Sequence, residues 1–255
     1  MAPRDATALA LDPENALRSE AQALNAQYGE LDTPKLLETA LHRLYPGKVA
    51  LVSSFGAESA VLLHLFSEVD ASAPVLFVDT RKLFGETLRY RETLVARFGL
   101  TGVRTITPDA DELAEADPQG ALWLKDPDRC CHLRKVLPLD RALDGFDAWM
   151  TGRKRFQSST RSKLELFEVA DGRIKINPLA NWSVEDLKDY AARLDLPPHP
   201  LVAQGFPSIG CMPCTDKVAP ARMRAPDAGA APTRWNAAFI CPRMGAKSTE
   251  AGSDP

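Results

Sequence analysis

Four of the five cysteines fall into two closely spaced pairs, and this pattern has the clearest potential for chemistry in the chain. Cys130 and Cys131 are adjacent, and Cys211 and Cys214 form a CxxC motif. Four thiolates suit zinc or an iron–sulfur cluster. Adjacent cysteines bind one small tetrahedral ion awkwardly but can span the larger edge of a cubane, so the set favours a cluster. Four unrelated buried cysteines and a CxxC redox pair are the competing interpretations.

A polar segment between an apolar run and a helical pattern could bind an anion. Small hydroxyl residues and glycine before a helix N-terminus aim backbone N–H groups at an anion. The segment lacks the Gly-Lys-Ser/Thr ending of a Walker A loop, and an ordinary strand–helix turn with a serine cap is the alternative. The polar segment follows Val52 and consists of Ser53, Ser54, Phe55, Gly56, Ala57, Glu58 and Ser59.

Basic residues gather near the first cysteine pair and after an apolar run that ends at Met150. Anion binding needs such donors at strand ends. A solvated face is the usual alternative, but it is weaker here because Thr151-Gly152-Arg153 directly follows the apolar run. The basic set comprises Arg129, Arg134, Lys135, Arg153, Lys154, Arg155 and Arg161.

The elements that must position these residues alternate between strands and helices. Apolar runs predict strands at 49–52, 74–79, 103–106 and 148–152, and helical spacing predicts helices within 15–46, after 59 and over 84–98. The alternation predicts an α/β fold, with a mostly parallel sheet and helices on both faces. Ligands of such sheets bind at the carboxyl ends of the strands. The loops after Val52, Val78 and Met150 should therefore form one site.

Composition excludes several classes of protein. The chain has 255 residues, 45% hydrophobic and 25% charged, which excludes a disordered or fibrous chain. The chain contains no run of about 18 apolar residues, so we expect no membrane span. The absence of a basic-then-apolar leader predicts a cytoplasmic protein. A net charge of −3 gives no support for a broad nucleic-acid-binding face. We expect an N-terminal helical segment at 1–46, an α/β domain at 47–220 and a separate tail at 221–255.

Several blocks together resemble the assimilatory adenylyl-sulfate (APS) reductases. These enzymes form the iron–sulfur branch of the PAPS/APS reductase family and have an adenine nucleotide α-hydrolase-like fold. The CC…CxxC set separates this branch from the phosphoadenylyl-sulfate (PAPS) reductases that lack those cysteines. The resemblance covers about residues 40–220 and rests on SSFGAES, VDTRKLFGETLRYRE, CCHLRKVLPLDRAL, TGRKRFQSSTRS, NPLANWSVEDL and GFPSIGCMPCT.

The resemblance implies thioredoxin-dependent reduction of adenylyl sulfate to sulfite and AMP in sulfate assimilation, with thioredoxin or glutaredoxin as reductant. Cys130, Cys131, Cys211 and Cys214 would ligate a 4Fe–4S cluster. The loop at 53–59 would hold the phosphosulfate, with Lys135 between substrate and cluster and Arg161 near the ribose. The strand ending at Asp79 would flank the adenine, and Arg153 would lie in the same site. We interpret Trp123, Trp149 and Trp182 as packing residues, and the sequence gives no oligomeric state.

The family pattern breaks near Pro220. The family nucleophile is a cysteine in a C-terminal ECG(I/L)H motif, whose thiolate attacks the sulfur of the substrate, so that AMP leaves and an S-sulfocysteine remains. Thioredoxin then releases sulfite. This chain contains no such motif. Cys241, in the context Ile-Cys-Pro, has none of its surroundings and is interpreted as a tail thiol without a catalytic role.

Codon arithmetic predicts that the tail is a frameshifted family sequence. Loss of one G from CCG GGC GAG, which encodes Pro-Gly-Glu, gives Pro-Ala-Arg, as in Pro220-Ala221-Arg222. The motif KVECGIH, written AAG GTG GAA TGC GGC ATT CAT and read one base later, gives the sequence of Arg234–Ile240. The restored frame can encode GEDARPGRWRGTDKVECGIH. The chain as written would then lack both its nucleophile and the arginines that grip the phosphosulfate.

Three alternative functions remain open at this stage. A PAPS-using reductase could keep the cluster if it accommodated a 3′-phosphate. An ATP pyrophosphatase or other adenylating enzyme could share the loop, although such enzymes more often carry an SGGxDS-like loop, from which Phe55 and Glu58 depart. A nucleotide-binding protein with a cluster or zinc and no turnover is the non-enzymatic alternative.

Overall fold

A six-stranded sheet with the order β3-β2-β1-β4-β6-β5 forms the centre of the molecule. The computed structural model describes residues 12–155 and 164–217. Every neighbouring pair of strands is parallel except β5 and β6, which pair antiparallel. The strands are β1 Val49–Val52, β2 Val75–Val78, β3 Val103–Ile106, β4 Ala148–Met150, β5 Phe167–Ala170 and β6 Arg173–Ile176.

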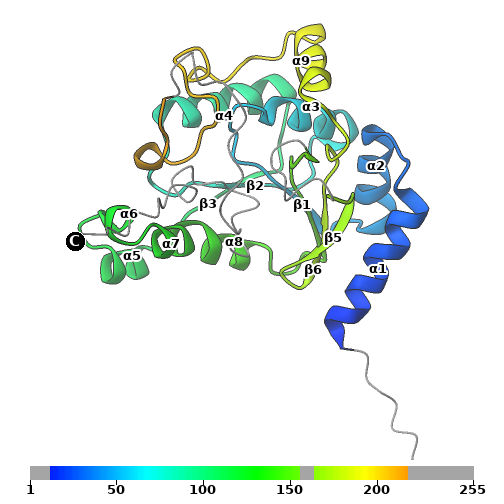
Figure 1. The fold of residues 1–255 in the computed structure, drawn as a ribbon, viewed down its shortest axis with the longest axis horizontal. Coiled ribbons are helices and arrows are strands. Elements are labelled where there is room, and N and C mark those ends of the chain that lie inside the picture. Colours follow the sequence, from blue (N-terminus) through cyan, green and yellow to red (C-terminus); the bar gives the residue numbers. More distant parts are fainter. Residues whose placement is uncertain (1–11, 156–163, 218–255) are drawn as a thin grey trace, which may run out of the picture.

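Helices cover both faces of the sheet, which confirms the predicted fold class (Figure 1). Helices α3, α4 and α9 lie on one side, and α5 to α8 on the other. The helices are α1 Pro13–Tyr28, α2 Thr33–Thr39, α3 Ser59–Asp70, α4 Gly85–Phe98, α5 Ala110–Ala116, α6 Leu122–Lys125, α7 Pro127–Cys131, α8 Leu137–Ala142 and α9 Val184–Arg193. Two π-helical turns, Ala40–Leu44 and His132–Val136, and a 3₁₀ turn, Met212–Cys214, complete the regular structure described.

The central strands are apolar on both sides because each face is covered. In β1, Val49 and Leu51 belong to the larger core on the α3 side, whereas Ala50 and Val52 belong to the smaller core on the α8 side. Successive side chains of a strand point to opposite faces. Short runs without polar alternation therefore form strands buried on both faces, as β1, β2 and β4 are. Strand β3, which contains Arg104 and Thr105, is more exposed. Within the described residues, none of the helices is long and apolar enough to cross a membrane.

The β5–β6 hairpin was not among the predicted strands. Its turn is Asp171-Gly172, and both residues have positive φ, 56° and 69°. An Asp-Gly pair between alternating segments is a strong local signal for a two-residue hairpin turn, because glycine and aspartate tolerate this conformation. The signal is present in the sequence and would have identified both strands.

Helix α1 packs along β5, at one edge of the sheet (Figure 1). The Asn25 side chain donates from Nδ2 to the Phe167 carbonyl oxygen at 2.7 Å. It also accepts the Phe167 backbone N–H at 3.0 Å through Oδ1. One amide side chain thus satisfies the outward-facing donor and acceptor of an edge-strand residue.

His199 is buried and neutral in the segment that leads from α9 towards the second cysteine pair. It is 1% exposed. The Leu201 N–H donates to Nδ1 at 3.2 Å, so the ring hydrogen lies on Nε2, which donates to Thr87 Oγ1 at 3.1 Å. Burial lowers the pKa of His199 from 6.5 to about 4, against a smaller opposing effect of Glu86.

The stability of the protein should therefore fall in mild acid. His199 takes up a proton more readily in the unfolded chain, so its contribution is complete above pH 6.5 and is lost as the pH falls towards 4. Between pH 7.5 and pH 5 this loss should be about 2 kcal/mol. Denaturant unfolding of the wild type and of His199→Gln at both pH values measures it. We expect a smaller pH dependence in the variant, and equal losses in the two proteins would contradict this prediction.

Candidate functional site

The loop after β1 is built around a buried phenylalanine. Phe55 has φ of +49°, and its ring packs edge-on against Phe77 with centroids 5.3 Å apart. The Phe55 N–H donates to Ser53 Oγ at 3.2 Å, which fixes the turn. The Phe55 side chain therefore belongs to the core, and only its backbone is available to a ligand. Ser54 is half-buried at the surface of the loop.

Two contacts connect this loop to other parts of the candidate site. Lys154, which follows β4 and is 3% exposed, forms an ion pair with Glu58 at 2.5 Å. A Cβ on Gly56 would lie 3.2 Å from Ser54 Oγ and 3.5 Å from the Ile209 carbonyl oxygen, so the segment before Cys211 approaches the loop closely. The carboxyl ends of β1 and β4 thus meet, as the alternating pattern predicts.

The carboxyl end of β2 continues into a tight turn. Asp79 Oδ1 accepts the Arg81 N–H at 2.9 Å, and Arg81 has φ of +59°. The next hydroxyl along the chain, Thr80 Oγ1, accepts the Lys82 N–H at 3.2 Å and lies 3.1 Å from Cys211 Sγ. Asp79 therefore shapes the turn that brings Thr80 to the second cysteine pair.

The four cysteines line one small cavity. Cys130 and Cys131 end α7, whereas Cys211 and Cys214 flank the 3₁₀ turn. The second pair is held in place by the Met212 N–H, which donates to the Lys82 carbonyl oxygen at 2.7 Å. Pairs distant in the sequence are thereby brought together. The cavity is lined by Lys82, Trp123, Pro127, Cys130, Cys131, Arg134, Lys135, Cys211, Pro213 and Cys214.

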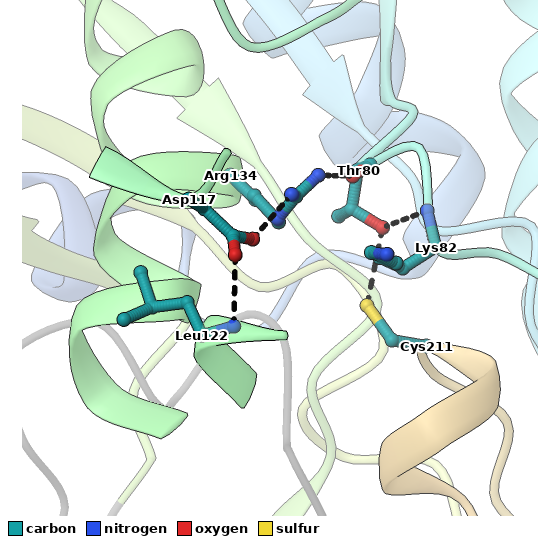
Figure 2. Close-up of polar contacts among 6 residues, drawn as sticks. All are labelled: Thr80, Lys82, Asp117, Leu122, Arg134 and Cys211. Atoms are coloured by element: carbon teal, nitrogen blue, oxygen red, sulfur yellow. Dashed lines mark hydrogen bonds and ion pairs between the residues drawn. The ribbon is translucent and has the colours of Figure 1, made fainter. Parts of the chain in front are cut away.

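Arg134, which lines this cavity, forms a buried ion pair with Asp117 (Figure 2). Arg134 donates from one terminal nitrogen to Asp117 Oδ2 at 2.6 Å and from the other to the Thr80 carbonyl oxygen at 3.0 Å. Asp117 Oδ1 also accepts the Leu122 N–H at 2.9 Å. Burial alone would raise the pKa of Asp117, but these hydrogen bonds hold the pKa below its usual value. Asp117 is therefore an anion at neutral pH.

The donors on the cavity wall fit a thiolate-ligated anionic group. Burial raises the pKa of Cys130, opposed by the nearby charges of Arg134 and Lys135. Arg134 Nε is buried and makes no hydrogen bond in the described structure. A cluster with thiolate and sulfide acceptors would supply the missing acceptor and charge. In the ranges 12–155 and 164–217, no group of three or more His, Cys, Asp and Glu side chains is arranged to hold a metal ion as it stands.

Arg153 lies in a separate charge cluster beside the smaller core. It donates to Glu168 Oε1 at 2.6 Å, and Lys175 Nζ lies 3.6 Å from the same oxygen. Lys175 also lies over the Trp149 ring, 4.4 Å from its centroid. Burial, with the charge of Arg153, lowers the pKa of Lys175 to about 8. The charge of Arg153 is thus partly compensated by the carboxylate of Glu168 in β5. Arg161, which the sequence analysis also places near the substrate, lies outside the described residues.

Sequence reasoning missed Lys82, which lines the cavity, and Thr80 and Asp117, which contact its lining residues. Thr80 and Lys82 carry a signal, because they come immediately after a strand predicted to end at the site. Asp117 carries none, since its partner Arg134 is distant in the sequence. Trp123 does pack, but it packs against Cys211 and Cys214 rather than in the main core.

Comparison with known protein families shows that residues 48–217 match the family model named phosphoadenosine phosphosulfate reductase domain. The chain belongs to this family. An adenosine 5′-phosphosulfate reductase of Mesorhizobium japonicum is 49% identical over 209 residues, which are 82% of this chain and 82% of the relative. The same name belongs to a relative from Chelativorans that is 46% identical over 79% of this chain and 82% of its own length.

Solved structures agree with the family and the fold. The phosphate complex of the PAPS reductase from Candida auris has a TM-score of 0.68 and 28% identity, covering 78% of this chain and 97% of that chain. The FMN adenylyltransferase of Candida glabrata, in complex with FMN and an ATP analogue, has a TM-score of 0.51 at 14% identity, covering 94% and 84% of the two chains. At 14% identity, the likeness to the FMN adenylyltransferase concerns the fold alone.

Proposed function

We propose that this chain binds adenylyl sulfate at the carboxyl edge of its sheet and carries a 4Fe–4S cluster beside it. The observation that carries the proposal is the lining of one cavity by Cys130, Cys131, Cys211 and Cys214. The cavity adjoins the strand-end loops through Thr80 and Gly56. The relatives named adenosine 5′-phosphosulfate reductase support the choice of substrate.

In this proposal the described residues bind and orient the substrate. The backbone N–H groups of the loop at 53–59, with the hydroxyl of Ser54, receive the phosphosulfate. Lys135, a buried cation on the cavity wall, places positive charge between the substrate and the cysteines. When bound, the cluster supplies a rigid connection between the two cysteine segments and an electrostatic environment beside the substrate.

The proposed reaction needs a thiolate that the chain as written lacks. In the family scheme this thiolate attacks the substrate sulfur, and the bond from sulfur to the bridging oxygen breaks, with its electron pair leaving on AMP. A thioredoxin or glutaredoxin dithiol then attacks the resulting S-sulfocysteine. That step releases sulfite and regenerates the enzyme thiol as the reductant becomes a disulfide. We therefore assign the reductase activity to the chain with a restored tail.

Binding tests the nucleotide part of the proposal without requiring turnover. We expect adenylyl sulfate to bind more tightly than PAPS or ATP in calorimetric titrations. Ser54→Ala should weaken adenylyl sulfate binding by roughly 10- to 100-fold, because it removes a hydrogen bond to a charged group. Ser67→Ala is the matched control, since the Ser67 hydroxyl donates to the His64 carbonyl oxygen within α3, away from the loop.

The alternatives predict different titrations. Preference for PAPS would favour a PAPS-using reductase, and preference for ATP would favour an adenylating enzyme. Equal affinities of wild type and Ser54→Ala for adenylyl sulfate would remove the loop from the site.

A further inference from the structure

The structure points to Asp117 as a positioning residue for the cysteine cavity, acting through Arg134 and Thr80 on Cys211; we propose this role on the basis of the cluster site proposed above. The Asp117 carboxylate accepts hydrogen bonds from Arg134 and from the Leu122 N–H. Its hydrogen-bonded route to the cysteines runs through the guanidinium that it holds, and its charge also acts directly on Cys130, where it adds to the rise in pKa caused by burial.

Asp117 fixes the orientation of the guanidinium. Arg134 and Asp117 have side chains only 5% and 3% exposed, so water does not compete for their hydrogen bonds. With one terminal nitrogen of its planar fork on Asp117, Arg134 directs the other towards the Thr80 carbonyl oxygen. Figure 2 shows this arrangement, in which Arg134 spans the space between Asp117 and Thr80.

Fixing the Thr80 backbone also fixes its hydroxyl. Thr80 Oγ1 accepts the Lys82 N–H and lies 3.1 Å from Cys211 Sγ. A metal-ligating Cys211 would be a thiolate, which can only accept, so the Thr80 hydroxyl must donate to it. The chain of contacts therefore runs from a buried carboxylate to a hydrogen bond on a proposed cluster ligand.

The same ion pair sets the position of the remaining Arg134 donor. Both terminal nitrogens are engaged, whereas Nε makes no hydrogen bond in the described structure, and Arg134 lines the cavity. Outer-shell partners of this kind orient metal ligands, and their loss commonly costs 10- to 100-fold in metal affinity. We expect a loss of this size when Asp117 is changed.

The test is the rate at which a ferrous chelator removes iron from the anaerobically purified protein. Asp117→Asn should lose iron about 10- to 100-fold faster than the wild type. The matched control is Glu112→Gln. This change removes an ion pair at the surface between Arg141 of α8 and Glu112 of α5, the helix that ends just before Asp117. The control should behave like the wild type both in its rate of iron loss and in its binding of adenylyl sulfate.

A double-mutant cycle separates positioning from general loss of stability. If Asp117 acts through Thr80, Thr80→Val should add little to Asp117→Asn, whereas independent effects would multiply. Should Asp117→Asn fail to fold, Arg134→Lys replaces it, because an ammonium keeps the charge but not the two-pronged contact.

Alkylation of the thiols distinguishes the failure of this inference from failure of the proposed cluster. In protein stripped of iron, Asp117→Asn should increase the alkylation rate of Cys211 relative to the wild type, measured by mass spectrometry of the labelled peptides. Protein that never contains iron would contradict the cluster, and the alkylation rates would still decide the role of Asp117. Iron loss and alkylation both within twofold of the wild type would overturn the inference.

Discussion

A gene in which one G is restored to the run after the Pro220 codon should encode a protein that forms sulfite from adenylyl sulfate, whereas the chain as written should form none above background. The physical reason is the nucleophile. Removal of a nucleophile typically costs about 10⁴- to 10⁶-fold in rate, because no other group can form the covalent intermediate. Sulfite release with thioredoxin and its reductase, measured for both proteins under identical conditions, gives the comparison.

Two controls make this result specific. The restored protein with the cysteine of its ECGIH motif changed to serine should be as inactive as the chain as written, while still binding adenylyl sulfate. Cys241→Ser in the chain as written should change nothing, because that thiol arises from the shifted frame. Sulfite formation by the chain as written, abolished by Cys241→Ser, would contradict the frameshift hypothesis.

Replacement of any one of the four cavity cysteines should remove the cluster. Cys214→Ser leaves three thiols, and the hydroxyl of serine is a poor ligand for iron. We expect the iron content of the purified protein to fall from about four per chain to background, together with its visible absorbance. Metal analysis and absorbance spectra of the anaerobically purified variant are the measurements.

This prediction also concerns folding. Metal binding at such sites is coupled to folding, so the variant should lose order around residues 130 and 211, detected as faster amide exchange there. Cys241→Ser serves as the matched control and should retain its iron. Zinc in place of iron would favour the structural-metal alternative, and full iron retention in Cys214→Ser would remove this residue from the ligand set.

Much of the fold follows from local patterns. The strands that end at Val52, Val78 and Met150 are short apolar runs followed by polar residues, which is the pattern typical of parallel strands buried on both faces. The carboxyl edge of the sheet could therefore be assigned as the site. The helical segment within 15–46 was also predicted, although it breaks before Asp32, whose side chain caps α2 by accepting the Lys35 N–H.

The residues that could not be predicted depend on contacts between distant segments. Nothing near Asp117 in the sequence indicates that Arg134 will be its partner or that the pair will be buried. Phe55 was assigned to the binding loop by its position, but its positive φ turns the ring into the core. Sequence spacing identifies which residues share an edge of the sheet, whereas the direction of each side chain depends on packing.

The hydrogen bonds from Asn25 to Phe167 have a consequence for association between molecules. An unprotected edge strand exposes backbone groups that can pair with a strand of another chain, a common route to aggregation. Asn25 occupies both outward-facing groups of Phe167, and α1 lies along the same edge. The N-terminal helix thus blocks the growth of the sheet beyond β5, and opposes edge-to-edge polymerisation through this edge at high protein concentration.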